Sequence, residues 1–507
     1  MMLTILLLIP FLGALLISVL PGAASPDSSE SASRSRTFTL ATLAVQCLLS
    51  FGLLIPFSAV EPGQQLVEIL PWLPQVGLEF SLGVDGLSLP LVLMNGVLCL
   101  VAAAASRSVE NRPRVYFALL LVISGAVNGA FLAQNLLLFF LFYELELIPL
   151  WLLIAIWGGA NRAYASTKFL IVTAVSGVLI LAAFLGIALV TGSVDFGIRP
   201  ILTTQMGLTS QLALMSCLLI GFGIKIPLFP FHTWLPDAHT EASTPVSVLL
   251  AGVLLKLGTY GLLRFCLGLF PEAWSVAAPW LAGWAAVSVL YGSLAAIAQT
   301  DMKRMVAYSS VGHMGYVLLA AAAATPLALI GALFQMVSHG LISAVLFLAV
   351  GVVYERTGTR DLNVLRGLLN PQRGLPLTGT LMIIGVMASA GIPGMAGFIS
   401  EFLVFKGSFE MFPVATLLSM VGSGLTAVYF LLLVNRAFFG RLAVAPGASQ
   451  NPKILYQVPF AQQIPALSMS LLILLLGVVP NLLVGLSQPA TAQLSELATL
   501  VQPGGLS

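Results

Sequence analysis

The chain has 507 residues, of which 59% are hydrophobic and 8% are charged, and its net charge is +2. A soluble domain carries about 25% charged residues, so this composition excludes a soluble protein and indicates a membrane protein with many spans. The small net charge gives no reason to expect a nucleic-acid partner. The four cysteines lie in apolar segments without the spacing of a metal site or a disulfide framework, and we interpret them as packing residues.

Fourteen segments reach the length of about 20 mainly apolar residues that a membrane-spanning helix needs. In chain order they are 2–20, 38–58, 84–105, 115–132, 136–157, 166–191, 211–231, 245–270, 277–299, 304–324, 327–354, 376–408, 412–438 and 465–488. The first segment has no basic start and no clear cleavage site, so we expect a retained span and not a signal peptide. The predicted fold class is an all-α polytopic membrane protein.

The seventh and twelfth spans are predicted to be broken helices. Pro227 and Pro230 remove backbone donors from the seventh, and the twelfth contains the sequence Gly391–Gly397 with a proline between glycines. Interrupted backbone at membrane depth is tolerated where it is buried in protein or lines a hydrated cavity. The two breaks are five spans apart, which places the broken helices in opposite directions, as in an inverted repeat.

Basic residues predict the orientation of the chain. Most of the 21 Lys and Arg residues lie in loops that follow odd-numbered spans. The positive-inside rule makes these loops cytoplasmic, so both termini are expected on the lumenal or periplasmic side. Lys225, Lys256 and Lys406 instead lie within predicted spans.

Two of these lysines are candidates for function because a charge in the membrane costs roughly 2.5–3.5 kcal/mol on insertion scales. Lys225 stands at the first break, and Lys256 lies too deep in the span 245–270 for its side chain to reach either surface. The proton affinity of a buried lysine depends on a nearby carboxylate, so moving that partner creates a switch.

Acidic residues provide candidate partners. Glu144 and Glu146 are two positions apart, about 200° around a helix, so they do not share a face. Glu144 is the stronger candidate, whereas a solvated, interfacial acid is an equal alternative for Glu146. Glu401 lies just after the second break, as Lys225 lies at the first, and these equivalent positions indicate equivalent roles. Lys406 is interpreted as an interfacial cation.

The spans also contain histidines. His313 follows Ser309 by four residues, and Gln335, His339 and Ser343 form a polar stripe on one helix face. Such a stripe can hold a row of waters, and neutral imidazole can both accept and donate a hydrogen bond, which suits a proton relay. Packing histidines are the alternative, and nothing beyond the residue type supports haem ligation.

His232 and His239 flank a short segment beside the first break. His232, nearer the membrane, is the better candidate for proton entry or a polar network, while His239 and Asp237 are interpreted as structural. The chain contains no nucleotide-binding, metal-ligand or hydrolase motif, so we expect no cofactor in it. The candidate proton sites are Glu144, Lys225, His232, Lys256, His313, His339 and Glu401.

Four segments carry a family resemblance: Tyr143–Pro149, His232–His239, Asp301–Ser310 and Gly394–Phe398. They resemble the antiporter-like subunits of respiratory complex I, and the similarity extends over residues 80–440. An acid, Glu401, stands where sister subunits have a lysine, which resembles chain 4 of the cyanobacterial and chloroplast NAD(P)H-quinone oxidoreductase complexes (NDH-1). Ser243 departs from the family, which usually has proline there.

The resemblance implies a division into four parts: N-terminal helices in 1–110, a five-helix repeat in 111–270, its inverted counterpart in 271–440, and a linker with a last helix in 441–507. It implies that Glu144 pairs with Lys225. It also implies that Lys256, His313 and His339 form a central relay and that Glu401 is its terminal site.

The function implied is proton translocation driven by quinone reduction elsewhere in a complex I-like assembly. Quinone and Fe–S clusters are expected in other subunits, and the partners are neighbouring membrane subunits and lipid. The expected location is a cyanobacterial thylakoid membrane, with a bacterial inner membrane as the alternative. Two other functions stay open: a subunit of a multisubunit cation/proton antiporter, and a membrane scaffold, including one in a photosynthetic complex specialised for carbon dioxide uptake.

Overall fold

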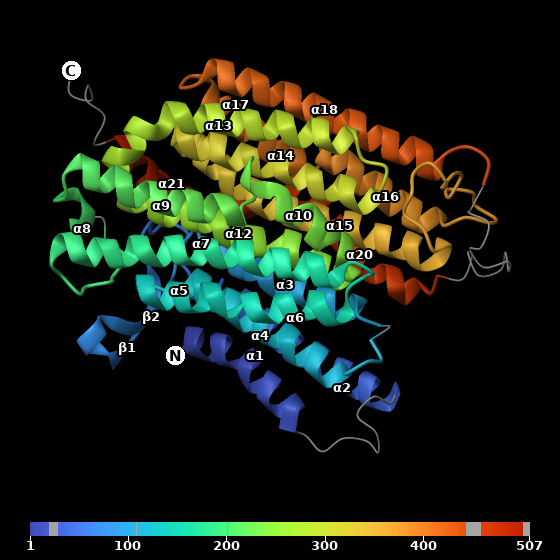
Figure 1. Ribbon diagram of the computed structural model, residues 1–507, viewed down its shortest axis with the longest axis horizontal. Helices are drawn as coiled ribbons and strands as arrows, with labels where there is room; N and C mark the ends of the chain where they lie inside the picture. The colour runs from blue at the N-terminus through green and yellow to red at the C-terminus, as the bar shows by residue number, and fades with distance from the viewer. Residues whose placement is uncertain (20–28, 108, 200, 443–457, 500–507) are drawn as a thin grey trace.

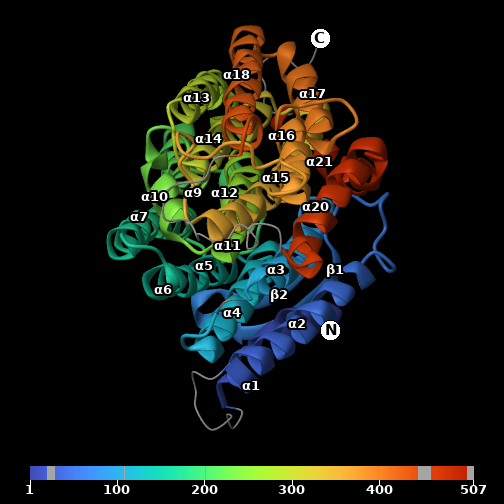
Figure 2. The ribbon, with the colours of Figure 1, turned by 90° about the vertical axis from the view of Figure 1, so that its right-hand side faces the viewer.

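The computed structural model describes residues 1–19, 29–107, 109–199, 201–442 and 458–499. Helices lie side by side along the long axis of the molecule, with a small β-hairpin at one end (Figure 1). Seen end-on from the end opposite the hairpin, α1, α2 and α4 lie at one side of the bundle and α13, α17 and α18 at the other (Figure 2). Lys453 and most of the linker predicted after residue 440 lie outside the described residues.

The first half contains α1 (Met2–Val19), α2 (Ser29–Gly52), β1 (Gln65–Leu73), η1 (Pro74–Val76), β2 (Leu78–Val84), α3 (Leu89–Ala105), α4 (Pro113–Leu132), α5 (Leu136–Leu145), α6 (Leu147–Trp157), α7 (Arg162–Thr191), α8 (Ile201–Thr204), α9 (Leu208–Lys225), η2 (Phe231–Thr233) and α10 (Trp234–Glu241). The second half contains α11 (Thr244–Leu249), η3 (Leu250–Leu254), α12 (Leu255–Gly261), η4 (Leu262–Leu267), α13 (Pro271–Ile297), α14 (Met302–Ala323), α15 (Pro326–Thr357), α16 (Pro376–Ser389), α17 (Ala396–Phe409), α18 (Pro413–Phe438), α20 (Phe460–Val478) and α21 (Asn481–Thr499).

The polytopic all-α prediction is confirmed. In the described part of the chain, 11 helices are long and apolar enough to cross a membrane, and α3 and α16 are shorter apolar helices. The predicted second span begins earlier, at Ser29, and ends at Gly52. The last predicted span is two helices, because Pro480 separates α20 from α21. The number fourteen therefore stays a prediction.

The two predicted breaks are present. Helix α9 ends at Lys225 and helix α16 at Ser389, each followed by irregular backbone. Side chains from neighbouring segments form hydrogen bonds with backbone groups at the first break. Trp234 Nε1 donates to the Ile224 carbonyl over 2.8 Å, and Ser288 Oγ accepts from the Phe229 amide over 3.2 Å. At the second break, Gly391 and Gly394 have φ angles of 68° and 90°, which glycine adopts without strain.

Three further irregularities were not predicted from sequence. The segment Thr244–Leu267 contains two π-helical stretches, η3 and η4, on either side of the turn that carries Lys256. The apolar run 136–157 is interrupted at Glu146, between α5 and α6. Residues 65–84 form an antiparallel hairpin. A search for apolar segments of about 20 residues does not detect two short strands.

A buried ion pair joins the hairpin to the irregular helix. Arg264 in η4 lies 2.5 Å from the Asp85 carboxylate, with side chains 13% and 4% exposed. Asp85 Oδ2 also accepts from Gln64, and its Oδ1 accepts from the amides of Leu87 and Ser88. Removing one partner of such a pair typically destabilises a protein by about 3–5 kcal/mol, so this contact fixes the end of the helix that carries Lys256.

The centre of the bundle is formed by Thr244–Leu267, α14 and α15. These three segments are almost entirely buried within the chain, whereas α1, α7, α18 and α20 expose more than half of their most apolar window. An apolar helix that exposes one side faces lipid or another subunit, while one buried all round belongs to the core. Lys256, His313 and His339 therefore lie on the three segments most shielded from lipid.

Candidate functional site

Lys225 lies in a buried ion pair with Glu146. Its Nζ is 2.6 Å from Glu146 Oε1, and the two side chains are 2% and 1% exposed. Nζ also donates to the Tyr143 carbonyl over 3.2 Å and lies 3.4 Å from the centre of the Tyr143 ring. The ammonium is therefore held by one carboxylate, one carbonyl and one aromatic face.

The expected Glu144–Lys225 pair is wrong for this structure. Glu144 is only partly buried and lies beside Gly177 of α7, whereas Glu146 reaches Lys225. The prediction assumed one continuous helix from 136 to 157. Pro149 lacks the N–H that would bond the Leu145 carbonyl, α5 ends at Leu145, and the side chain at the break turns inward.

Lys256 forms a second centre with His339. Its Nζ is 2.7 Å from His339 Nδ1 and donates to the Ala251 carbonyl over 2.5 Å. Ala251 lies in η3, where π-helical geometry changes which carbonyls are bonded within the helix. Lys256 is fully buried, and no carboxylate of the described residues lies within ion-pair distance of it. The Lys256–His339 hydrogen bond can carry a proton in either direction.

His313 continues this chain. The ring centres of His313 and His339 are 5.5 Å apart. His313 Nδ1 is 2.7 Å from the Ser309 carbonyl, and Nε2 is 3.3 Å from the Ser389 carbonyl and 3.2 Å from Ser389 Oγ. A neutral ring can donate from Nδ1 and accept from Ser389 Oγ, while a cationic ring can donate to both carbonyls. The site thus accommodates both protonation states.

The second helix break creates this arrangement. The Ser389 carbonyl lies four residues before Pro393, which has no N–H to bond it. That carbonyl is free to face His313 Nε2 on α14. The proline therefore breaks the helix and also supplies a polar partner for the buried histidine.

Glu401 lies on the other side of a small cavity. The cavity, about 10 Å³, is lined by His313, Gln335, His339, Ile342, Ala388, Ser389, Gly397 and Glu401. This is close to the smallest space that one water molecule needs, and the lining offers the two to four polar partners that a buried water requires. Glu401 Oε2 accepts from Ser423 Oγ over 2.6 Å and lies against Gly391, where a Cβ would be 2.9 Å from it.

The two other histidines lie outside this cluster of direct contacts. His232 packs among aromatic rings, with centroids 4.8 Å from Tyr291 and 5.9 Å from Phe229, and its Nδ1 has no hydrogen-bond partner. His239 is fully buried and stacks on Phe347, with neither ring nitrogen hydrogen-bonded. The interpretation of His239 as structural overlooked this unpartnered imidazole. Its place in α10, between two predicted spans, did not indicate that it would be fully buried.

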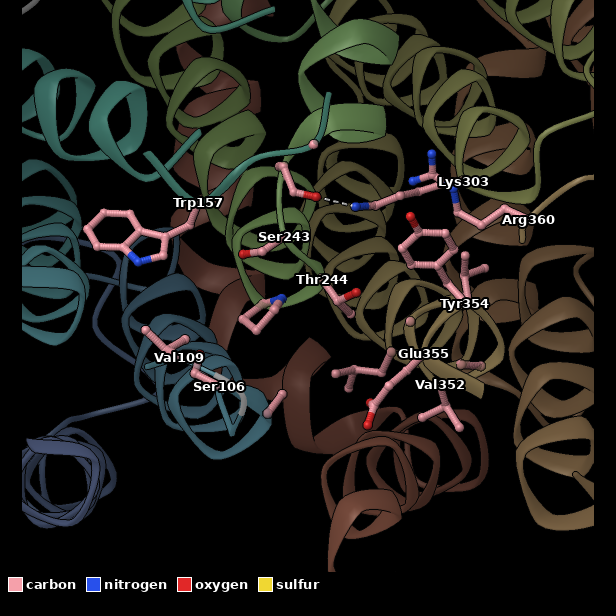
Figure 3. A pocket seen from close by; sticks show the side chains of 18 of the residues that line it. Ser106, Val109, Trp157, Ser243, Thr244, Lys303, Val352, Tyr354, Glu355 and Arg360 are labelled. Carbon is pink, nitrogen blue, oxygen red and sulfur yellow. Dashed lines mark hydrogen bonds between the residues drawn. The ribbon is translucent and has the colours of Figure 1, made fainter. Parts of the chain in front are cut away.

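A larger pocket of about 820 Å³ opens between the two halves of the chain (Figure 3). Its lining includes Glu110, Glu241 and Glu355, and the buried Lys303 donates to the Ala242 carbonyl over 2.5 Å. By its position Lys303 is one of the basic loop residues that predict the orientation of the chain, yet the residue is only 3% exposed. Ser243, at the position where the family resemblance implies proline, also lines this pocket.

Comparisons with known proteins agree with this architecture. A family model described as NADH:quinone oxidoreductase/Mrp antiporter, TM, matches residues 133–426. The chain is similar to NAD(P)H-quinone oxidoreductase chain 4 2 of Thermosynechococcus vestitus, with 42% identity over 94% of this chain and 89% of the relative. It is also similar to chain 4 1 of Synechococcus sp. (strain JA-3-3Ab), with 47% identity over 74% and 72% of the two chains.

Solved structures with the same fold include a chain of respiratory complex I from Thermus thermophilus, with a TM-score of 0.84, 30% identity, and coverage of 98% of this chain and 100% of that one. A chain of the Mrp complex from Dietzia sp. has a TM-score of 0.84 at 24% identity, covering 99% and 98%. The second likeness shows the fold alone.

Proposed function

This chain belongs to the family of antiporter-like membrane subunits shared by NADH:quinone oxidoreductases and Mrp antiporters, and we propose that it translocates protons as chain 4 of a complex I-like quinone oxidoreductase. Quinone reduction takes place in other subunits, which hold the redox cofactors. The membrane is a cyanobacterial thylakoid membrane, the basic loops are cytoplasmic, and both termini face the lumen.

The observation that carries this proposal is the buried path from Lys256 through His339 and His313 to Glu401. Each member lies in hydrogen-bond contact with the next, packs against it, or faces the same water-sized cavity. The relay contains an amine, two imidazoles and a carboxylic acid, so a proton can move along it in small free-energy steps. No group of three or more metal-ligating side chains occurs in the described residues, and the relay needs none.

The Lys225–Glu146 pair supplies the switch. Moving one charge against 100 mV requires about 2.3 kcal/mol. Breaking a buried ion pair typically changes free energy by about 3–5 kcal/mol, which exceeds that requirement. A neighbouring subunit that disturbs this pair can therefore change the energy of a proton at Lys256, because both charges lie in the same low-dielectric interior.

Lys225→Ala is expected to abolish most proton pumping through this chain. The change leaves Glu146 buried without a counter-ion, so assembly of the complex is measured first. Pumping is then measured by dye quenching in sealed vesicles, together with the rate of quinone reduction. The double variant Lys225→Ala/Glu146→Gln removes both charges and serves as the control for folding; full pumping in either assembled variant contradicts the proposed function.

The pocket of Figure 3 gives protons a route in from the basic face. Three carboxylates in its lining attract protons, and the buried Lys303 also lines it. The unpartnered His239 interacts electrostatically with both Lys303 and Lys256, which links the pocket to the relay. A polar pocket of this size holds water. We therefore assign proton uptake to this pocket and the final proton site to Glu401.

Ser243→Cys tests this route. A charged thiol reagent attached at this position fills part of the pocket, so pumping is expected to fall several-fold after labelling, while unlabelled Ser243→Cys pumps normally. The matched control is the unsubstituted chain treated with the same reagent, because Cys47 and Cys217 are partly exposed, whereas Cys99 and Cys266 are buried. Complete labelling without any loss of pumping would place uptake elsewhere.

The same relay distinguishes the two rival functions. A cation/proton antiporter subunit requires pumping that depends on sodium and not on quinone reduction. A scaffold requires that neutral substitutions in the relay leave pumping unchanged. Both outcomes are measured in the vesicles that test Lys225→Ala.

A further inference from the structure

Two carboxylates, not one, lie near the Lys225 ammonium. Glu146 forms the ion pair, but neither of its oxygens accepts a hydrogen bond in addition. A buried carboxylate usually accepts several hydrogen bonds, so the ion pair with Lys225 is the main contact that holds this one in place. It also lies at the interruption between α5 and α6, where helical hydrogen bonds do not fix the backbone as firmly.

Glu144 occupies a different environment two residues earlier. The three atoms nearest to a Cβ built on Gly177 all belong to the Glu144 carboxyl group, so the absent side chain at 177 makes room for this acid. The flanking residues Leu141, Leu145 and Ile148 are 45%, 43% and 58% exposed. Glu144 therefore lies at the edge of an outward apolar surface, while Glu146 faces the interior.

The ammonium interacts with both of these acids. It contacts the carbonyl and the ring of Tyr143, the residue next to Glu144. It interacts electrostatically with Glu144 as well as with Glu146. A lysine ammonium has three N–H donors, and the carbonyl and Glu146 engage two of them. A small rotation about the Tyr143 contact can direct the third toward Glu144.

From this geometry, and resting on the proposed function, we propose that Lys225 exchanges between Glu146 and Glu144 while one proton moves in the opposite direction. In the state described here, Lys225 pairs with ionised Glu146 and Glu144 carries a proton. In the second state, the O–H bond of Glu144 is broken, an O–H bond forms on Glu146, and Lys225 pairs with ionised Glu144. The ammonium keeps its three protons throughout.

This exchange has a favourable electrostatic property. Each state contains one ammonium, one carboxylate and one neutral carboxylic acid, so no charge is left alone in the apolar interior. An uncompensated buried charge is strongly destabilising, whereas a swap of partners avoids that intermediate. The result is transfer of one proton from the outer carboxyl group of Glu144 to the inner one of Glu146, while Lys225 changes its ion-pair partner.

The experiment compares Glu144→Gln, Glu146→Gln and Gly177→Ala in the assembled complex. Each glutamine removes one proton site while keeping a similar shape, and each is expected to lower pumping by about tenfold or more. Gly177→Ala pushes the Glu144 carboxyl group out of its place without touching Glu146 or Lys225, so pumping is expected to fall several-fold. Gly424→Ala is the matched control, because nothing lies within 4 Å of its added Cβ.

Infrared difference spectra identify the proton. The carbonyl band of a protonated carboxylic acid is expected to disappear in Glu144→Gln and to persist in Glu146→Gln under resting conditions. Full pumping by assembled Glu146→Gln, or a resting band that Glu144→Gln leaves intact, overturns the exchange. If Lys225→Ala also pumps fully, the proposed function itself fails; if Lys225→Ala is inactive while Glu144→Gln pumps normally, only this exchange fails.

Discussion

Lys256→Arg in this chain is expected to leave an assembled complex with its buried positive charge but about 100-fold slower proton transfer through the relay. Arginine cannot lose a proton in a protein, whereas the Lys256 ammonium can pass one to His339 Nδ1 over their 2.7 Å hydrogen bond. A purely structural cation would tolerate the exchange better than a proton carrier. Pumping is measured in vesicles, and assembly is measured by the abundance of the intact complex.

Two controls make this result specific. Lys406→Arg repeats the same chemical change at an exposed position on α17 and is expected to have no effect. Lys256→Ala removes both the charge and the proton carrier, so its pumping is expected to match that of Lys256→Arg. Normal pumping by Lys256→Arg would show that the lysine does not carry the proton.

Glu401→Gln is expected to block the end of the relay by a similar factor of about 100. The amide retains a carbonyl that can accept the hydrogen bond from Ser423, which is 2.6 Å long in the native structure, and has nearly the same volume. It cannot take up the proton that reaches the cavity shared with His313. The measured quantity is again the number of protons pumped per quinone reduced.

Glu401→Asp and Glu410→Gln complete the comparison. Aspartate keeps the proton site but moves it by one methylene, so intermediate pumping is expected. Glu410 lies exposed beyond the end of α17, and its neutralisation is expected to change nothing. If Glu401→Gln pumps as well as the native chain, protons leave the cavity by another residue.

The sequence predicted the membrane class, the positions of both helix breaks, and several of the ionisable residues that the interior contains, although not the burial of Lys303. These predictions depend on composition and on residues with strong local effects. A proline removes a backbone donor wherever it lies in a helix, and a lysine in a long apolar run costs insertion free energy in any fold. The predicted cluster of Lys256, His313 and His339 is also present, because three central helices bring those positions together.

Other features could not be predicted in this way. The family resemblance implied Glu144 as the partner of Lys225, and helical phase indicated only that the two acids do not share a face. Phase is reliable only while a helix is continuous. The interruption at Glu146 changed the direction of that side chain. The π-helical stretches beside Lys256, and the Ser389 carbonyl that faces His313, depend on packing between segments far apart in the chain.

By itself, then, the sequence determined which charged groups enter the membrane and where the helices break, because insertion energies and missing backbone donors act locally. Only the tertiary structure decided which acid neutralises Lys225 and which carbonyls and cavity connect Lys256 with Glu401. Those choices depend on distances of a few ångströms between different helices, since ion pairing and hydrogen bonding in an apolar interior are made or lost over that range.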